Sequence, residues 1–265
     1  MGTHTGGSMT DNVTFHDLSG KSVFITGGGS GIGAALTDGF LAQGAKVAFV
    51  GRSDASAFCD EMDQKHGGNR PHFMQCDITN IGELKKCIKQ AGERHGPISV
   101  LVNNAANDAR HTADEVDEKF WEFMLDVNLK AYFFAAQGVV DGMREHGGGS
   151  IINFSSISYM MGNAGYPLYT MANSGINGLT RSLAREFGPD HIRVNALAPG
   201  WVLTQKQKDM WVTEEGLNAH MARQCLPDPL APEDIVDGVL FLASKSSKAM
   251  TGQALVIDGG VVVTG

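Results

Sequence analysis

The segment SVFITGGGSGIG, residues 22–33, places an apolar run of residues directly before a glycine-rich turn. The run Ser22–Thr26 is typical of a buried β-strand, and the residues from Ile32 onward have helical spacing. Glycines let the backbone turn sharply and approach a phosphate, and the free N–H groups of a helix N-terminus attract an anion. The order strand, turn, helix predicts a pyrophosphate-binding unit, although a purely structural tight turn gives the same local pattern.

The rest of the chain repeats this alternation of short apolar runs and longer helical segments. Most runs are apolar throughout, as in strands that are buried on both faces of a parallel sheet. We therefore expect an α/β fold, Rossmann-like and doubly wound, with a mainly parallel seven-stranded sheet and helices on both faces. The predicted strands are Ser22–Thr26, Lys46–Val50, His72–Cys76, Val100–Asn103, Ser150–Phe154, Ile192–Ala196 and Ala254–Ile257. The predicted helices are Ile32–Gln43, Ala55–Lys65, Ile81–Arg94, Asp117–Arg144, Leu168–Glu186 and Pro232–Ala243.

The 265 residues suit one large α/β domain, which we expect to span residues 20–265. Residues 1–19 begin with a polar, Gly/Thr-rich stretch and are predicted to be a flexible N-terminal arm or a vector-derived remnant. Residues 201–230 carry two tryptophans and two prolines and lack a clear period. This stretch is either a surface excursion or a substrate lid, because it follows a strand at the sheet edge where α/β proteins bind ligands.

Composition excludes several classes of partner. The formal net charge is −8 and no basic run exceeds two residues, so neither nucleic acid nor an anionic membrane is an expected partner. No apolar stretch is long enough to span a bilayer, and no signal peptide pattern opens the chain. The four cysteines show neither a CxxC pair nor metal-ligand spacing, so we expect no metal site and a cytoplasmic location.

The glycine turn has the spacing TGxxxGxG, and further motifs follow it in a recognisable order. They are NNAA at residues 103–106, Asn128, Ser156, Tyr169 thirteen residues after that serine, IRVN at 192–195 and PG at 199–200. With these motifs the chain resembles the short-chain dehydrogenase/reductase family from Gly20 to the C-terminus. The resemblance implies an oxidoreductase that moves a hydride between a nicotinamide dinucleotide and a secondary alcohol or sugar hydroxyl.

The resemblance also implies a binding site for the dinucleotide. Asp77 is expected to bind the adenine amino group, although by itself it reads as the cap of the following helix. The NNAA segment is expected to line the adenosine, and the residues after Pro199 to hold the nicotinamide amide. The implied cofactor-binding residues are Gly27, Ser30, Gly31, Ile32, Gly33, Arg52, Ser53, Asp77, Ile78, Asn104, Ala105, Ala106, Tyr169, Asn173, Pro199, Gly200, Val202 and Thr204.

The end of the second predicted strand bears on the choice between NAD and NADP. NAD-users of this family usually carry a carboxylate there, which accepts a hydrogen bond from the ribose 2′-hydroxyl. Here the position is Gly51, followed by Arg52 and Ser53. A guanidinium pairs well with a 2′-phosphate, so the sequence favours NADP over NAD. Alternatively, Arg52 stacks on the adenine and tolerates either cofactor.

The catalytic set implied by the resemblance lacks one member. Tyr169 is expected as the general base or acid, Ser156 to orient the substrate oxygen and Asn128 to anchor a proton-relay water. A phenol has a reference pKa of about 10, and the family lowers it with a lysine four residues later. That position is Asn173, which carries no charge. We therefore expect catalysis that is weakened or shifted to alkaline pH.

Other cations and phenols do not restore the pattern. Arg181 is two helical turns beyond Asn173 and Lys130 points away from Asn128 on a helix, while Tyr159 and Tyr166 lack the family spacing to the serine. Two other readings stay open at this point: a non-catalytic NAD(P)-binding homologue, acting as a sensor or subunit, and a Rossmann-like methyltransferase.

Within the family, the chain looks like bacterial aldose 1-dehydrogenases of the D-xylose, L-fucose or L-rhamnose type, which give lactones. The similar segments are residues 107–111, INFSSIS at 152–158 and residues 211–226. Polar side chains at a pocket mouth suit a sugar or polyol, because each buried hydroxyl needs a partner. The candidate substrate residues are Asn107, Asp108, His111, Ser158, Trp201 and Trp211.

Two alternatives to a sugar-binding site remain. Asp108, Arg110 and His111 together would equally form a surface salt bridge that leads into a helix. A 3-oxoacyl or steroid-type carbonyl reductase also fits the motifs. The resemblance further implies a homotetramer that pairs the helices Asp117–Arg144 and Leu168–Glu186 and the segment Ala254–Val263.

Overall fold

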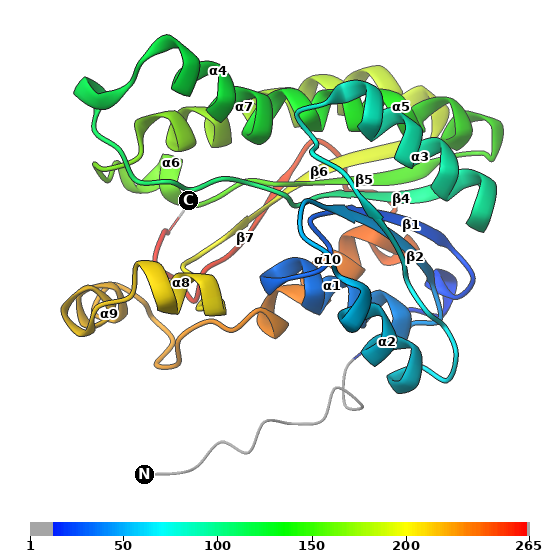
Figure 1. Ribbon diagram of the computed structural model, residues 1–265, viewed down its shortest axis with the longest axis horizontal. Helices are drawn as coiled ribbons and strands as arrows, with labels where there is room; N and C mark the ends of the chain where they lie inside the picture. The colour runs from blue at the N-terminus through cyan, green and yellow to red at the C-terminus, as the bar shows by residue number, and fades with distance from the viewer. Residues whose placement is uncertain (1–12, 264–265) are drawn as a thin grey trace.

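The computed structural model describes residues 13–263 and contains one sheet, which runs through the middle of the molecule (Figure 1). Its seven strands have the order β3-β2-β1-β4-β5-β6-β7, and all neighbouring pairs are parallel. The predicted Rossmann-like, doubly wound sheet is confirmed. The strands are β1 Ser22–Thr26, β2 Lys46–Gly51, β3 His72–Gln75, β4 Ile98–Asn103, β5 Gly149–Phe154, β6 Ile192–Pro199 and β7 Ala254–Ile257.

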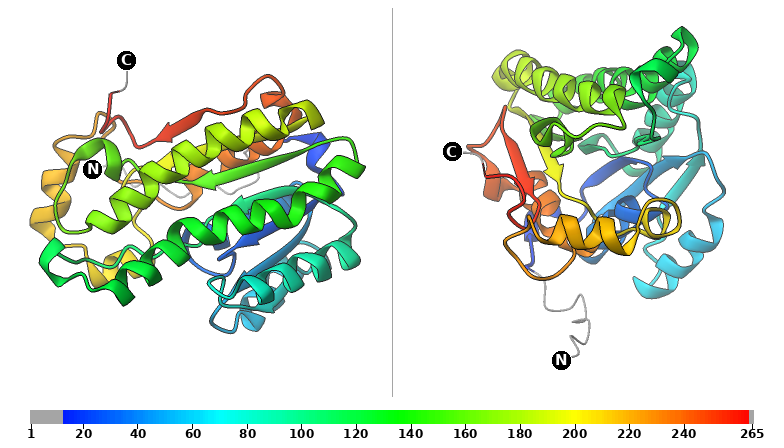
Figure 2. Two further views of the ribbon diagram at one scale, coloured as in Figure 1. Left: turned by 90° about the horizontal axis from the view of Figure 1, so that it is seen from above. Right: turned by 90° about the vertical axis from the view of Figure 1, so that its left-hand side faces the viewer.

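Helices cover both faces of the sheet, as the three views show (Figures 1 and 2). One face packs against α1, α2 and α10, and the other against α3, α5 and α7. Each face therefore buries its own apolar cluster, which accounts for strands without alternation. The helices are α1 Gly31–Ala42, α2 Ser56–Lys65, α3 Ile81–His95, α4 Glu118–Leu125, α5 Ala131–Glu145, α6 Ser158–Met161, α7 Pro167–Phe187, α8 Gln205–Met210, α9 Glu214–Met221 and α10 Glu233–Ala243.

The helical run predicted over Asp117–Arg144 is present without a break from Glu118 to Glu145, but it is not α-helical throughout. A π-helical turn at Asp126–Lys130 separates α4 from α5. Within this turn the buried side chain of Asn128 donates to the carbonyl of Met124 at 2.9 Å and also reaches across to the loop after β4. The added residue of a π-turn re-aims one side chain without ending the helix, and such turns are common at functional sites.

The stretch 201–230 is less irregular than the sequence indicated. It contains the short helices α8 and α9, whose first turns are capped by the hydroxyls of Thr204 and Thr213. At the other end of the chain, the ordered domain starts before residue 20, because Leu18 is buried and His16–Leu18 form a 3₁₀ turn. Residues 1–12 of the predicted arm lie outside the described residues. Between residues 13 and 263, no helix has the length and apolar character needed to cross a bilayer.

The strand order determines where on the sheet a ligand site is expected. The chain moves outward from β1 to β3 and then returns to add β4 on the other side of β1. At this reversal the loops after β1 and β4 separate and leave a crevice at the carboxyl edge of the sheet, where α/β folds bind ligands. The loops after β5 and β6 end at the same edge, so four loops that are distant in sequence surround one space.

Candidate active site

The glycine turn after β1 has a backbone that few other residues could adopt. Gly27 and Gly31 have φ of +73° and +53°, in the left-handed region. A Cβ on Gly33 would collide with the carbonyl oxygen of Gly27, so α1 starts as close to the strand as two backbones allow. The hydroxyl of Thr37 donates to the carbonyl of Gly28 at 2.8 Å and fixes the turn. This cradle fits a pyrophosphate at the α1 N-terminus, where the N-cap Ser30 makes no side-chain cap bond.

The NNAA segment lies directly against this turn. The amide of Asn104 donates to the carbonyl oxygens of Thr26 and Gly27, each at 3.1 Å. The hydroxyl of Thr26 accepts from the backbone N–H groups of Asn104 and Ala105 at 3.0 and 3.1 Å. The loops on either side of the crevice are therefore tied together at its base, which holds the predicted adenosine-facing segment in place.

At the predicted adenine end, the carboxylate of Asp77 is partly occupied. Its Oδ1 accepts from the backbone N–H and the hydroxyl of Thr79 at 3.0 and 2.8 Å, but it does not cap the following helix α3, whose N-cap is Asn80. Its Oδ2 has no such bond among the described residues, and Ile78 is buried beside it. Arg52 and Ser53 lie exposed at the end of β2, and within residues 13–263 the Arg52 side chain forms no hydrogen bond or ion pair.

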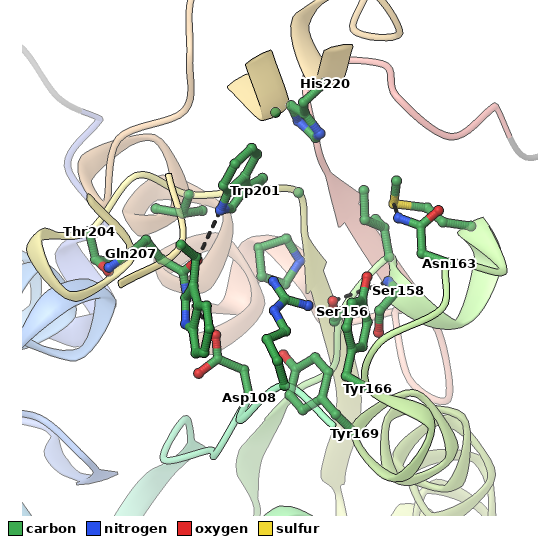
Figure 3. A pocket seen from close by; sticks show the side chains of 18 of the residues that line it. Asp108, Ser156, Ser158, Asn163, Tyr166, Tyr169, Trp201, Thr204, Gln207 and His220 are labelled. Atoms are coloured by element: carbon green, nitrogen blue, oxygen red, sulfur yellow. Dashed lines mark hydrogen bonds between the residues drawn. The ribbon is translucent and has the colours of Figure 1, made fainter. Parts of the chain in front are cut away.

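A cavity of about 700 Å³ opens at the predicted nicotinamide end of this crevice (Figure 3). Its walls come from α1, the loops after β4, β5 and β6, and the helices α8 and α9. Several residues predicted for separate roles meet in this one space. They are Ile32, Pro199, Gly200, Val202 and Thr204 from the cofactor set, Ser156 and Tyr169 from the catalytic set, and Asp108, Ser158, Trp201 and Trp211 from the substrate set.

Tyr169 and Ser156 face this cavity together (Figure 3). The Ser156 hydroxyl accepts from the backbone N–H of Ser158 at 3.1 Å, which fixes its direction. Burial and the nearby carboxylate of Asp108 raise the pKa of the Tyr169 phenol, and the hydrogen-bonding side chains of Ser156 and Asn173 oppose this only in part. A phenol beside a hydroxyl on the wall of one cavity can accept and return a proton.

The comparison with known proteins agrees with this geometry. Residues 27–262 match the profile of a protein family described as enoyl-(acyl carrier protein) reductase. The chain belongs to the short-chain dehydrogenase/reductase family. It is an oxidoreductase of the type that acts on CH–OH groups with NAD or NADP.

Three relatives illustrate the match. The chain is 47% identical to "Probable galactose dehydrogenase GalD" of Rhizobium meliloti over 93% of this chain and 97% of that protein. It is 43% identical to a D-xylose 1-dehydrogenase of Caulobacter vibrioides over 94% of this chain and 98% of that protein. A blue fluorescent protein from a metagenomic library, solved with NADPH, superimposes with a TM-score of 0.85 at 33% identity, covering 93% of this chain and 99% of that one.

The position of the family's lysine holds a neutral side chain, Asn173. Asn173 is buried, and its amide donates to the backbone carbonyl of Tyr169 at 2.8 Å. No cation is among the groups that most affect the pKa of Tyr169. Lys130 pairs with Asp126 at 3.0 Å, and Arg181 lies near Tyr159. The cavity thus brings Ser156 and Tyr169 together, while the position expected to hold a lysine carries no charge.

Asn128 is committed to the loop after β4. Its amide oxygen accepts from the backbone N–H of Asn107 at 2.8 Å, and its amide nitrogen donates to the Asn107 carbonyl at 3.0 Å. The side chain therefore holds the backbone of Asn107 in place beside the cavity. Its predicted role as the anchor of a relay water stays a prediction.

Two predicted substrate residues lie behind the cavity wall. Asn107 is held by Asn128, and neither it nor His111 lines the cavity. His111 is buried; its Nδ1 lies 2.9 Å from the carbonyl of Ala109, and its Nε2 accepts from the backbone N–H of Leu168 at 3.2 Å. The ring therefore links the loop after β4 to the start of α7, which makes His111 a positioning residue for the helix that carries Tyr169.

The predicted salt bridge among Asp108, Arg110 and His111 is replaced by two longer-range contacts. Asp108 pairs with Lys206 of α8 at 2.7 Å. The Arg110 guanidinium lies over the ring of Tyr166 at 4.2 Å and over Trp211 at 5.5 Å. Both contacts bind the loop after β4 to other elements around the cavity.

Sequence reasoning also missed part of the lining. The cavity residues that it did not select include Arg110, Met161, Asn163, Tyr166, Gln207, His220 and Arg223. The threonine–glutamate pattern at Thr213–Glu215 is an N-cap signal that could have revealed α9, and thus the helix that carries His220.

Proposed function

We propose that this protein is an NAD(P)-dependent aldose 1-dehydrogenase that converts a sugar hemiacetal to a lactone. The observation that carries the proposal is the meeting of Ser156 and Tyr169 with the nicotinamide-side residues Pro199 and Thr204 on the walls of a single cavity. That arrangement puts a proton acceptor and a hydroxyl-orienting group at the place where a hydride acceptor would lie.

The chain's own residues supply positioning and proton transfer. Bound NAD⁺ or NADP⁺ supplies the hydride acceptor. The Ser156 hydroxyl binds the C1 oxygen of the sugar, and the Tyr169 phenolate takes the proton from that oxygen. The C1–H bond breaks as hydride leaves, a C=O bond forms, and the phenol returns its proton to solvent.

The relatives support a sugar as the substrate. Two of them carry the names galactose dehydrogenase and D-xylose 1-dehydrogenase. The cavity lining is also rich in polar groups, including Asp108, Ser158, Asn163 and Gln207. A hydrocarbon or acyl chain would leave the buried Ser158 hydroxyl, which has no partner among the described residues, unpaired at a cost of about 1–3 kcal/mol.

For the cofactor we propose a preference for NADP. The support is the exposed guanidinium of Arg52 at the end of β2, with Gly51 in place of a carboxylate. A 2′-phosphate there would gain a charge-assisted hydrogen bond, and no carboxylate at that position would repel it.

The test is a substrate screen with a matched inactive variant. Pentoses, hexoses and 6-deoxyhexoses are incubated with NAD⁺ or NADP⁺ between about pH 7 and pH 10, and reduced cofactor is followed by absorbance. Aldose turnover that is lost in Tyr169→Phe supports the proposal. Turnover only with 3-oxoacyl or steroid substrates would replace the substrate class. Tight cofactor binding without any turnover would instead establish the non-catalytic homologue that Asn173 favours.

Assembly and location are proposed with the function. We propose a homotetramer, supported by the exposed apolar side chains Trp121, Phe123 and Phe133 on α4 and α5. Light scattering of the purified protein tests this, and a monomer would contradict it. A cytoplasmic location is supported by the four cysteines, all of which are free thiols.

A further inference from the structure

Three residues that line the cavity each carry a buried polar atom with no hydrogen-bond partner in the described chain. These atoms are the hydroxyl of Ser158, the indole nitrogen of Trp211 and the Nε2 atom of His220. Ser158 lies at the end of the loop after β5, whereas the other two belong to the stretch between β6 and α10. Buried polar atoms are almost always paired, so three unpaired atoms around one space indicate that a ligand pairs them.

The lid holds His220 in a fixed orientation. Its ring packs edge-on against Trp201, with centroids 5.4 Å apart and planes at 82°. The Trp201 indole donates to the side-chain oxygen of Gln207 at 2.9 Å, as the dashed line in Figure 3 marks. The Gln207 amide in turn donates to Asp108 at 2.6 Å. A chain of three contacts therefore runs from the loop after β4 to the imidazole.

Trp211 is fixed in a similar way. The Arg110 guanidinium lies over both its indole and the ring of Tyr166, so the tryptophan is held against the start of α7. Pre-organised groups of this kind bind a ligand without losing further side-chain freedom.

The chemistry of the three atoms defines their partner. Burial lowers the pKa of His220, so its imidazole is neutral near pH 7 and its Nε2 can donate or accept one hydrogen bond. The Trp211 indole only donates, and the Ser158 hydroxyl does both. Hydroxyl groups satisfy all three, because each hydroxyl is both donor and acceptor. An apolar ligand satisfies none, and an anion satisfies only the donors.

We propose that His220 is the specificity-determining residue of this cavity, and that with Ser158 and Trp211 it binds the hydroxyl groups of the sugar that do not react. This inference rests on the proposed function and adds to it the residues that bind the sugar hydroxyls other than the one at C1. Ser156 and Tyr169 bind the reacting oxygen, while His220 binds from the lid on the other side of the space.

The test measures binding as well as turnover, because Asn173 weakens the chemistry. Calorimetry in the presence of saturating NADP⁺ gives the dissociation constants of D-galactose, D-xylose and a series of monodeoxy-galactoses. His220→Phe keeps a planar ring and removes both nitrogens. We expect it to weaken galactose binding by about tenfold or more, the effect of leaving one polar pair unmade.

The deoxy sugars give the sharper result. The wild type should bind one of the monodeoxy-galactoses more weakly than it binds galactose. His220→Phe should bind that deoxy sugar and galactose with equal affinity, because the missing hydroxyl and the missing imidazole belong to the same hydrogen bond. His220→Asn, which restores a donor and an acceptor, should recover part of the discrimination. Ser158→Ala and Trp211→Phe should each remove discrimination at a different hydroxyl.

Matched controls come from buried unpaired atoms elsewhere in the chain. His95, at the end of α3, and Ser22, at the opposite edge of the sheet, also have unpaired buried atoms and do not line the cavity. His95→Phe and Ser22→Ala should leave sugar binding unchanged.

Two results would overturn the inference and are distinguishable from failure of the proposed function. In the first, the dissociation constants of all deoxy sugars relative to galactose are the same in His220→Phe as in the wild type. His220 would then bind no sugar hydroxyl, even if the wild type oxidised sugars well. If the variant lost the same factor for all sugars and His220→Asn did not recover, its role would be structural. Absence of sugar binding by the wild type with either cofactor would overturn the proposed substrate class itself.

Discussion

Asp108 and Lys206 form an ion pair of 2.7 Å that joins the loop after β4 to helix α8, in the stretch 201–230 that is the predicted lid. The same carboxylate accepts from Gln207 at 2.6 Å, so two successive residues of α8 bind one side chain. Burial by itself would raise the pKa of Asp108, but the hydrogen bond and charge of Lys206 and the bond from Gln207 outweigh it and lower the pKa. The carboxylate is therefore ionised at neutral pH and keeps the lid attached.

Asp108→Asn should move catalysis to lower pH. The negative charge of Asp108 is one of the causes that raise the pKa of Tyr169, and the phenol acts as a base only when it is deprotonated. With that charge removed, the phenol ionises at lower pH, so the rise of kcat with pH should begin earlier. The measurement is the pH profile of kcat with saturating sugar, and the exposed Asp114→Asn is the control. A profile that moved to higher pH would contradict the assignment.

Lys206→Met should act in the opposite direction on the same phenol and should also loosen the lid. Without the ammonium, the charge of Asp108 is less compensated and the pKa of Tyr169 rises. We expect the KM for the sugar to increase and kcat near pH 7 to fall, with recovery at alkaline pH. Lys208→Met, on the same helix and without an ion pair among the described residues, is the matched control.

Asn173→Lys should restore the charge that the family normally places one helical turn after the tyrosine. A cation at that distance lowers the pKa of a phenol by about one to three units, so kcat near pH 7 should rise by about tenfold or more. Asn173→Gln supplies a longer side chain without charge and should not reproduce the gain. Equal pH profiles for the lysine variant and the wild type would show that this position does not control Tyr169.

Gly33→Ala should abolish dinucleotide binding. The added Cβ would collide with the carbonyl oxygen of Gly27, so either the turn or α1 must move away from the pyrophosphate site. Titration of NADPH fluorescence measures the loss. Gly92→Ala in α3 is the control, because a Cβ there meets nothing within 4 Å, and it should bind the cofactor as the wild type does. Unimpaired binding by Gly33→Ala would mean that the cofactor does not use this turn.

Arg52→Ala should change the choice of cofactor. Loss of a guanidinium–phosphate pair should weaken NADPH binding by roughly tenfold or more and leave NADH binding nearly unchanged. Arg94→Ala, another exposed arginine, should affect neither. If both cofactors weakened equally in Arg52→Ala, the side chain would be stacking on the adenine instead.

The sheet was predictable because its information is local. Each strand is an apolar run of a few residues next to a turn signal, and the observed ends differ from the predicted ones by at most three residues, as at Pro199 of β6. The glycine turn was predictable for the same reason, since its backbone angles select glycine at Gly27 and Gly31.

The contacts that join the stretch 201–230 to the cavity wall were not predictable, because they depend on pairs of residues that are far apart in sequence. Asp108 and Lys206 are separated by 98 residues, and no sequence pattern near either residue predicts their contact. His111 was predicted to bind the substrate because its segment looks like that of aldose dehydrogenases and carries polar side chains, yet both of its ring nitrogens are used by the backbone. The π-helical turn around Asn128 likewise has no signature of its own within a continuous helical period.

The loop from Asn107 to Arg110 limits how this cavity could be re-engineered for another sugar. Asn128 forms hydrogen bonds with the loop at Asn107. Asp108 of the loop pairs with α8, and Arg110 lies over Trp211. Mutations in this loop that enlarge the pocket would also break its contacts with α8 and Trp211. Libraries aimed at new substrates should instead vary Asn163, Ala164 and Ala219, which line the cavity and fasten no other element to it.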